Sequence, residues 1–272
     1  MYFYDFEYNG KMLSDYDSMI CSFGSSGSDE VSLGSELTWN TIKNNHSYAS
    51  SVVSSSYDDN YTAPLSICKK KCNSYISNTY SDLEIRNITK WLNSKKFYKF
   101  KPIYKDGEMQ DVYYIGSFNL TAVTVGSSCI GFNLTFQSNS PFGFAEKQIF
   151  DFTNIDSNQK MSIDNNSDEY DYIYPKIKIT LHENGKLILN NISFSDSMVV
   201  DNCQSGEVLH FDGETKTIVS SLGTLHSNLY SDFNYNFLKI FCEEEKTENI
   251  ITSSLPCDLT IEFSERRKIG VI

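Results

Sequence analysis

Apolar and polar residues alternate along much of this chain, which is the pattern of half-buried β-strands. In Tyr2–Tyr8, four aromatic side chains fall on one face of the predicted strand, and Asp5 and Glu7 fall on the other. Asn9-Gly10 follows directly and is a strong signal for a tight turn. Further strands are predicted in the first half at residues 19–23, 51–54, 101–105, 111–118, 120–125 and 130–137. Asp106-Gly107 predicts the turn between the third and the fourth of these.

The second half repeats short predicted strands at the intervals typical of a β-sandwich. They are expected at residues 176–181, 186–191, 198–202, 208–211, 215–220, 237–242, 250–252 and 258–263. Asp212-Gly213 separates the fourth from the fifth. No internal sequence repeat at a fixed period is present, which argues against a solenoid or a propeller.

One segment has the pattern of a helix. Ser81-Asp82-Leu83-Glu84 has the form of a capping box, in which the serine accepts a hydrogen bond from the third helical amide and the glutamate reaches back. Ile85, Ile88 and Leu92 then recur at helical spacing. We therefore expect one short helix in the first half of the chain.

Composition and length indicate two mainly β domains. Only four alanines occur among 272 residues, while tyrosine and phenylalanine reach 18 each, and aromatic residues suit pleated, half-buried surfaces. The length favours two domains. We expect a first domain at 1–140, a linker at 141–152 and a β-sandwich domain at 153–272, because Ser140-Pro141-Phe142-Gly143 interrupts the strand pattern. The polar, serine-rich stretch from Glu36 to Tyr61 predicts a long loop or a two-stranded arm.

Charge and cysteine content limit the partners that the chain can have. A net charge of −12 disfavours a non-specific DNA-binding protein and fits a surface that nucleic acid passes without sticking. Seven dispersed cysteines without a CxxC pair predict free thiols rather than a zinc site. No uninterrupted apolar run approaches 18 residues, so no membrane span is expected.

The sequence holds no strong catalytic or cofactor-binding motif. The four histidines are isolated, and His210 with Asp212 is the one pair that could share a strand face toward a metal. No glycine-rich phosphate loop, nucleophile elbow or Cys–His signature is present. We therefore expect no enzyme activity, no metal and no cofactor.

Sugar binding is the chemistry that a sandwich of this kind most often suggests. Both tryptophans, Trp39 and Trp91, lie in the first half, so a sugar would have to stack on other aromatic rings of the second half. The candidates are Tyr170, Tyr172, Tyr174, Tyr230, Phe233 and Tyr235. Aromatic residues in a sandwich belong to cores or interfaces more often than to ligand sites, so we expect this domain to bind no simple sugar tightly.

A basic segment is the sharpest local feature of the sequence. It contains seven basic residues and no acidic one: Arg86, Lys90, Lys95, Lys96, Lys99, Lys101 and Lys105. The segment has three interpretations: a solvated face, a nucleic-acid patch, or a docking surface for an acidic protein such as a neighbouring copy. The acidity of the remaining chain argues against the nucleic-acid patch. These residues are our candidates for a protein interface.

Several of these segments resemble, in the same order, the distal tail proteins of long-tailed phages (siphophages) that infect Gram-positive bacteria. The opening strand with Asn9-Gly10 resembles the start of that family. The other matching segments are Phe23–Glu36, Arg86–Leu92, Val112–Phe118, Gly131–Phe136, Ser140–Gly143 and Tyr174–Thr180.

The resemblance implies a ring-forming first domain, related in fold to tail-tube proteins and resembling a β-sandwich or barrel, with one short helix and an extended arm that embraces the neighbouring subunit. A galectin-like β-sandwich would follow. The expected homohexameric ring would join the tail tube to the tail hub, anchor receptor-binding components and let DNA pass only through its lumen. The protein would lie at the virion tail tip after assembly in the host bacterial cytoplasm. It would have no membrane partner.

Two other functions remain open at this point. A carbohydrate-binding module of an adhesin would use the sandwich, and a component of a phage-tail-like bacteriocin would use the same ring without a genome. The length of 272 residues leaves no room for an inserted carbohydrate-binding module of the kind that some family members carry.

Overall fold

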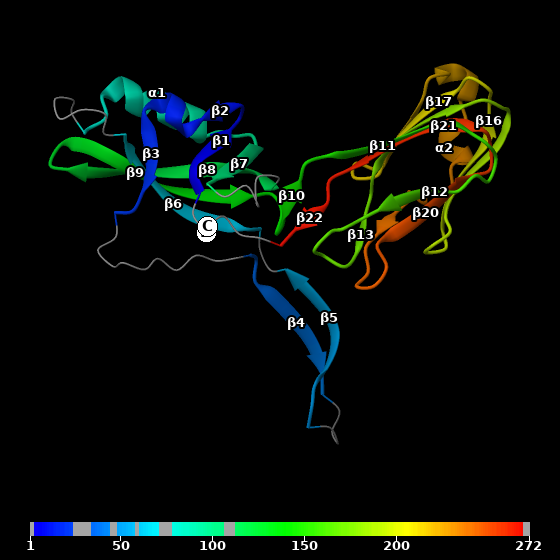
Figure 1. Cartoon of the computed structure of the whole chain (residues 1–272), viewed down its shortest axis with the longest axis horizontal. Helices are drawn as coiled ribbons and strands as arrows, with labels where there is room; N and C mark the ends of the chain where they lie inside the picture. Colours follow the sequence, from blue (N-terminus) through cyan, green and yellow to red (C-terminus); the bar gives the residue numbers. More distant parts are fainter. Residues whose placement is uncertain are drawn as a thin grey trace. The chain divides into compact units, whose positions relative to one another are not determined.

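The computed structural model describes residues 3–23, 34–43, 48–57, 60–70, 78–105 and 112–268. The chain consists mostly of β-strands, as the composition predicted, and it divides into two compact units. The first unit comprises Met1–Ala145 and Arg267–Ile272, and the second comprises Glu146–Arg266. Figure 1 labels the elements of both units.

A nine-stranded antiparallel sheet forms the first unit, with the order β2-β1-β7-β8-β9-β6-β3. The short strand β10 pairs with β8 and with β22. The strands are β1 (Phe3–Tyr8), β2 (Lys11–Met12), β3 (Ser18–Cys21), β6 (Thr62–Lys69), β7 (Tyr98–Tyr104), β8 (Val112–Val125), β9 (Ser128–Ser138), β10 (Gly143–Ala145) and β22 (Arg266–Arg267). A 3₁₀ helix, η1 (Leu13–Tyr16), follows β2.

The turn after β1 forms where the sequence predicted it. Asn9 and Gly10 have φ angles of 51° and 72°, and two successive left-handed residues are what a two-residue hairpin of this kind requires. β1 and β2 pair across this turn, with Tyr8 opposite Lys11. The predicted alternation holds for Phe6 and Tyr8, which lie in a fully buried aromatic core. A register shift between Phe3 and Asp5 breaks it earlier in the strand, so Tyr4 is exposed and Asp5 is buried.

The helix α1 (Asp82–Leu92) begins with the predicted capping box. The Ser81 hydroxyl accepts from the Glu84 N–H at 3.4 Å, and the Ser81 N–H donates to the Glu84 carboxylate at 2.7 Å. Ile88, Trp91 and Leu92 are the buried residues of the helix. They pack into the same aromatic cluster as β1 and therefore attach the helix to the sheet.

Strand β8 runs further than the sequence suggested. Residues 111–118 and 120–125 were expected as two strands, but Val112–Val125 is one strand of 14 residues. Asn119, at the expected break, lies opposite Thr135 of β9, so the ladder continues through it. The expected turn at Asp106-Gly107 lies outside the described residues.

Strands β4 (Leu37–Ile42) and β5 (Ser51–Tyr57) form a separate two-stranded sheet. In the described part of the chain these two strands pair only with each other (Figure 1). They lie inside the stretch 36–61 that was expected to be a loop or an arm, and the structure shows a hairpin. We call residues 37–57 the arm.

The second unit is a sandwich of two antiparallel sheets. One has the order β11-β21-β14-β17-β18, and the other has the order β12-β20-β15-β16. The first sheet comprises β11 (Gln148–Ile155), β14 (Lys176–Leu181), β17 (Val208–Asp212), β18 (Thr217–Ser220) and β21 (Cys257–Phe263). The second comprises β12 (Met161–Asp164), β15 (Gly185–Asn191), β16 (Asp196–Cys203) and β20 (Glu248–Ser253). The pair β13 (Tyr172–Ile173) and β19 (Ile240–Phe241), a 3₁₀ helix η3 (Gly223–His226) and a short helix α2 (Leu229–Asp232) complete the unit.

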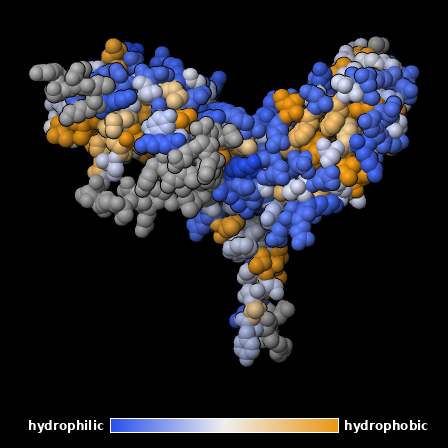
Figure 2. Space-filling model, in the orientation of Figure 1, coloured by the Kyte–Doolittle hydropathy of each residue, from blue (hydrophilic) through white to orange (hydrophobic). Residues whose placement is uncertain are grey.

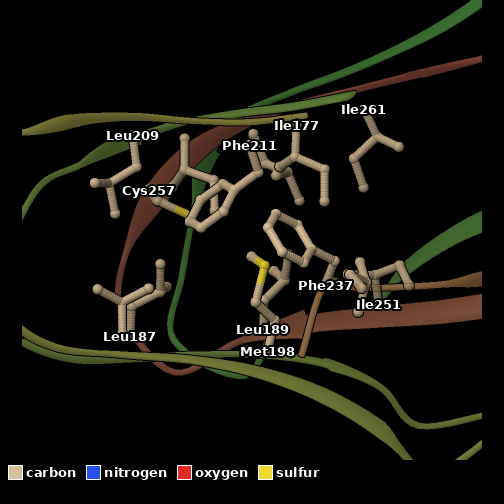
Figure 3. Packing of buried hydrophobic residues seen from close by; sticks show 14 of the residues in the cluster. Ile177, Leu187, Leu189, Met198, Leu209, Phe211, Phe237, Ile251, Cys257 and Ile261 are labelled. Carbon is tan, nitrogen blue, oxygen red and sulfur yellow. The ribbon is translucent and has the colours of Figure 1, made fainter. Parts of the chain in front are cut away.

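The core of the sandwich lies between the two sheets, as Figure 3 shows. Ile177, Leu209 and Ile261 face inward from the five-stranded sheet, and Leu189 and Met198 face them from the other sheet. All five side chains are buried. This arrangement is the period-two alternation read from the second half of the sequence, and the predicted mainly β fold class is confirmed.

The segment expected as a linker, 141–152, contains β10 and most of β11 instead. Phe150 and Phe152 pack against the sandwich core while Asp151 faces outward, so β11 begins before the expected domain start at residue 153. At the other end of the sandwich, Arg267 returns to the first unit. The strand expected at 237–242 is limited to Ile240–Phe241.

A buried polar cluster fixes the region around η3 and α2. His226 is almost fully buried, with its Nδ1 2.7 Å from the Glu207 carboxylate and its Nε2 3.3 Å from the Asp232 carboxylate. Glu207 is fully buried and also accepts from the Gln204 N–H and the Ser220 hydroxyl. Because every one of these partners is in the second unit, the cluster holds η3 and α2 to the sandwich.

Candidate assembly interface

Between Leu37 and Asn40 the arm has one apolar and one polar face. Leu37 and Trp39 alternate with Thr38 and Asn40, so the two pairs lie on opposite faces of the hairpin. The Asn40 amide donates to the Ser54 hydroxyl at 3.0 Å on the polar face. On the apolar face Trp39 is 56% exposed, although an indole of this size is normally buried.

Other large apolar side chains of the arm are exposed as well. They are Ile42, Val52 and Val53, and Figure 2 shows hydrophobic residues at the surface of this hairpin. The base of the arm is attached, because the Tyr57 ring meets the Phe142 ring edge-on at 4.8 Å. An apolar hairpin face of this kind marks an interaction surface.

The structure divides the basic segment between helix, loop and strand. Arg86 and Lys90 lie one turn apart on α1, and Lys95 and Lys96 follow in the loop. Phe100 of β7 points into the core that α1 covers, so Lys99 and Lys101 point to the opposite face of the sheet. The seven residues therefore do not form a single patch.

The individual basic residues also differ in their partners. Lys99 lies over the Tyr113 ring at 4.1 Å, and Lys101 lies opposite Glu7 across the β1–β7 ladder. Five others are exposed and have no ion-pair partner among the residues that the structure describes: Arg86, Lys90, Lys95, Lys96 and Lys105. These five are available to an external acidic surface.

A groove of about 450 Å³ lies beside α1 in the first unit. Its aromatic lining consists of Tyr16, Trp91 and Tyr98. Trp91 is fixed from two sides, because its Nε1 donates to the Tyr8 carbonyl at 2.8 Å and its ring stacks on Tyr16 at 4.4 Å. The groove is therefore a formed feature of the folded unit. Lys90 of the basic segment also lines the groove.

Charge is distributed unequally between the two units. Residues 146–266 contain 21 acidic and nine basic residues, whereas the rest of the chain contains 14 of each. The whole net charge of −12 therefore lies in the second unit, and the first unit is neutral. The basic segment is thus part of a unit that does not repel acidic partners.

The positions considered for metal chemistry have other roles. His210 is exposed on β17, and Asp212 forms an ion pair with Lys176 at 3.2 Å. Among the described residues, no group of three or more His, Cys, Asp or Glu side chains could hold a metal ion. His210 and Asp212 lie on β17, an inner strand of the five-stranded sheet that pairs with β14 and with β18.

The aromatic residues considered for sugar stacking differ in exposure and in their contacts. Phe233 is buried in the sandwich core, while Tyr170, Tyr230 and Tyr235 are exposed. Tyr172 and Tyr174 contact each other edge-on, with ring centroids 5.2 Å apart, and the Lys216 ammonium group covers the Tyr174 ring.

No disulfide bond joins the cysteines of the described residues. Burial raises the pKa of Cys203 to about 12, so its thiol is unreactive at neutral pH. Cys72 lies outside the described residues. Within the described part of the chain, no helix has the length and apolar character needed to cross a membrane.

Comparison with known proteins identifies the family. The profile described as "Phage tail protein N-terminal domain" matches residues 1–140, and the one described as "Phage tail C-terminal domain" matches residues 142–263. The chain belongs to this phage tail protein family. A comparison with curated proteins gave no match.

The fold of this phage tail protein is also found in a solved structure. The Dit protein of phage SPP1 is described as a paradigm of the hub adsorption apparatus in phages infecting Gram-positive bacteria. It aligns over 96% of this chain and 98% of its own, with a TM-score of 0.66 and 10% sequence identity. The resemblance to distal tail proteins stated from the sequence is confirmed at the level of family and fold.

Sequence reasoning missed two features of the candidate interface in the phage tail protein. Strand β4 was not predicted, although Leu37 and Trp39 alternate with polar residues and give the signal of a strand. The groove was not predicted either, because Asn9, Tyr16 and Trp91 come from separate segments of the chain. A local pattern cannot reveal a groove that the tertiary fold assembles.

Proposed function

We propose that this phage tail protein is a structural component of the tail tip that forms a closed ring of six copies. The ring joins the tail tube to the tail hub, anchors receptor-binding components and lets DNA pass through its lumen. It assembles in the cytoplasm of the host bacterium and performs no catalysis. The family membership and the Dit fold support this proposal.

The main structural support for the proposed ring is the arm. Its apolar face contains Leu37 and Trp39, and the described residues of the chain provide no surface that covers it. An exposed apolar hairpin is an aggregation hazard unless a partner buries it. In a closed ring, every copy offers one arm and one acceptor surface, so all arms are covered and no free end remains.

Mass measurement of the intact assembly tests the ring. Native mass spectrometry and light scattering of the full chain, alone and with the tail-tube protein of the same phage, should give a closed oligomer of six copies. A variant in which a short Gly-Ser turn replaces residues 38–56 should remain monomeric with an unchanged circular dichroism spectrum. A strict monomer for the wild type at high concentration with the tube protein present would overturn the proposal.

The second unit serves assembly rather than sugar recognition in this proposal. It contains no tryptophan, and its candidate stacking rings Tyr172 and Tyr174 are engaged with each other and with Lys216. Calorimetric titration of the full chain with glycans of the host cell wall should show no saturable binding. Saturable micromolar binding would favour the adhesin function instead.

A further inference from the structure

Several side chains that can donate hydrogen bonds line the groove beside α1. Lys11 and Lys90 contribute ammonium groups, and Asn9 and Asn87 contribute carboxamides, whereas no carboxylate lines the groove. The Lys11 ammonium also donates to the Tyr16 hydroxyl at 3.3 Å, which leaves two of its three N–H groups for a ligand. Asp15, on η1 near the groove, is engaged in accepting from the Met12 N–H at 2.9 Å. Such a groove suits a ligand that presents several carboxylate oxygens.

A tight turn of the second unit presents such oxygens. Glu243 and Lys246 exchange backbone hydrogen bonds of 3.1 and 3.2 Å, which places Glu244 and Glu245 at the tip. All three glutamates are exposed and have no ion-pair partner among the described residues.

The one basic residue of this turn does not neutralise the glutamates. The Lys246 ammonium donates to the Ser193 carbonyl and lies 4.2 Å from the centre of the Phe194 ring. It is therefore directed to its own unit. The turn thus presents three carboxylates from a backbone that its own hydrogen bonds hold in shape, so little conformational entropy is lost when it binds.

We propose that the groove binds the turn Glu243–Lys246 of a second copy of this chain, with Lys11 and Lys90 facing Glu244 and Glu245. The inference rests on the proposed assembly of several copies. Charge complementarity carries it: the acidic turn belongs to the unit that holds all of the net charge of −12, and the groove belongs to the neutral unit. A contact of this kind orients the second unit of one copy on the first unit of the next and steers their association.

Fluorescence of Trp91 tests the groove directly. In full-length protein with Trp39→Phe, Trp91 is the sole tryptophan, and it lines the groove. The probe is a synthetic peptide of residues 240–249 with serine in place of Cys242. It should produce a saturable change in emission that weakens at high salt.

Two substitutions show whether the predicted charges form the contact. Peptide affinity should fall at least about tenfold in Lys11→Gln/Lys90→Gln, and by a similar factor when glutamines replace both tip glutamates of the peptide. The matched control is Lys70→Gln/Lys160→Gln, which changes two exposed lysines outside the groove and should leave the affinity unchanged. An absent response, or equal affinity for the glutamine peptide, would overturn the inference.

Mixing two charge-reversed chains tests whether the contact joins different copies. Lys11→Glu/Lys90→Glu and Glu244→Lys/Glu245→Lys should each assemble poorly alone at low salt, and an equimolar mixture should regain assembly. If assembly is regained only when one chain carries all four substitutions, and not in the mixture, the turn binds the groove of its own chain and the inference is overturned. If the wild type forms a ring and both charge-reversed variants assemble as it does, the inference is overturned and the proposed ring stands. If the wild type never assembles, the proposed ring is overturned, and the peptide titration is then the test of binding in the groove.

Discussion

Replacing Trp39 with serine should weaken assembly of the proposed ring without destabilising the fold. The residue lies on the apolar face of the arm, and among the described residues no other aromatic ring contacts its indole. A tryptophan can bury about 250 Å², and Trp39 is 56% exposed, so roughly 140 Å² remains for a neighbouring copy to cover. At about 25 cal/mol per Å², this burial is worth about 3.5 kcal/mol at each contact between copies.

An effect of this size is measurable as a change in the equilibrium between monomer and ring. A loss of about 3.5 kcal/mol corresponds to a roughly 300-fold weaker contact. Native mass spectrometry across a dilution series should therefore show Trp39→Ser as a monomer at concentrations where the wild type is assembled. The melting temperature of the monomer should change by less than about 1 °C, since exposed positions contribute little to stability.

The matched control is Tyr230→Ser, which removes an equally exposed aromatic side chain from the second unit. It should leave assembly unchanged. If Trp39→Ser assembles over the same concentration range as the wild type, then the apolar face of the arm is not buried in the ring and the argument from its exposure is refuted.

Three further outcomes follow from the structure. Lys95→Glu/Lys96→Glu should slow assembly at low salt and lose this effect at high salt, because rim charges act mainly on the association rate; an unchanged rate at low salt would show these lysines to be merely solvated. Lys99 is left out of that variant because it packs over an aromatic ring. His226→Ala should lower the free energy of unfolding in urea by about 3 kcal/mol, since it leaves a fully buried glutamate without its histidine partner, whereas the exposed His210→Ala should change it by less than about 0.5 kcal/mol. The hydrogen bond from Lys69, followed by the one from the Ser81 N–H, lowers the pKa of Glu84. Glu84 therefore contributes stability above its unfolded pKa of about 4.3, and this contribution is lost as the pH falls through the lowered folded pKa. The stability difference between the wild type and Glu84→Gln should disappear in that acidic range, and a difference that persists there would contradict this reasoning.

Local signals in the sequence predicted the elements that depend on neighbouring residues. The capping box at Ser81 and Glu84 places the start of α1, and Asn9-Gly10 places the first turn, because both structures form within a few residues of chain. The sandwich strands β14 to β18, β20 and β21 were predicted for the same reason, with bounds identical to the observed ones for β14, since Ile177 and Ile179 alternate with lysines.

Features that depend on distant segments were not predictable in the same way. Asn119 was read as a break, but its partner in β9 carries the ladder through it. In 237–242, Phe237 and Leu238 enter the core without joining a strand, because the Asp196 carboxylate accepts the Lys239 N–H that a ladder would otherwise use. Strand β11 was missed because the break at Ser140–Gly143 led us to assign the following residues to a linker, although Phe150 and Phe152 alternate with Asp151.

The path of the chain through its two units constrains the order of synthesis and folding. Strand β10 ends at Ala145, and its partner β22 begins at Arg266, after the entire sandwich has been translated. At roughly 5–20 residues per second, the ribosome needs several seconds to make the intervening residues. The sandwich strands β20 and β21 are made only at the end of that interval, and one edge of β10 stays unpaired until β22 follows them. A nascent chain released before β22 would keep this edge open, so a complete first unit signals that the second unit has already been made.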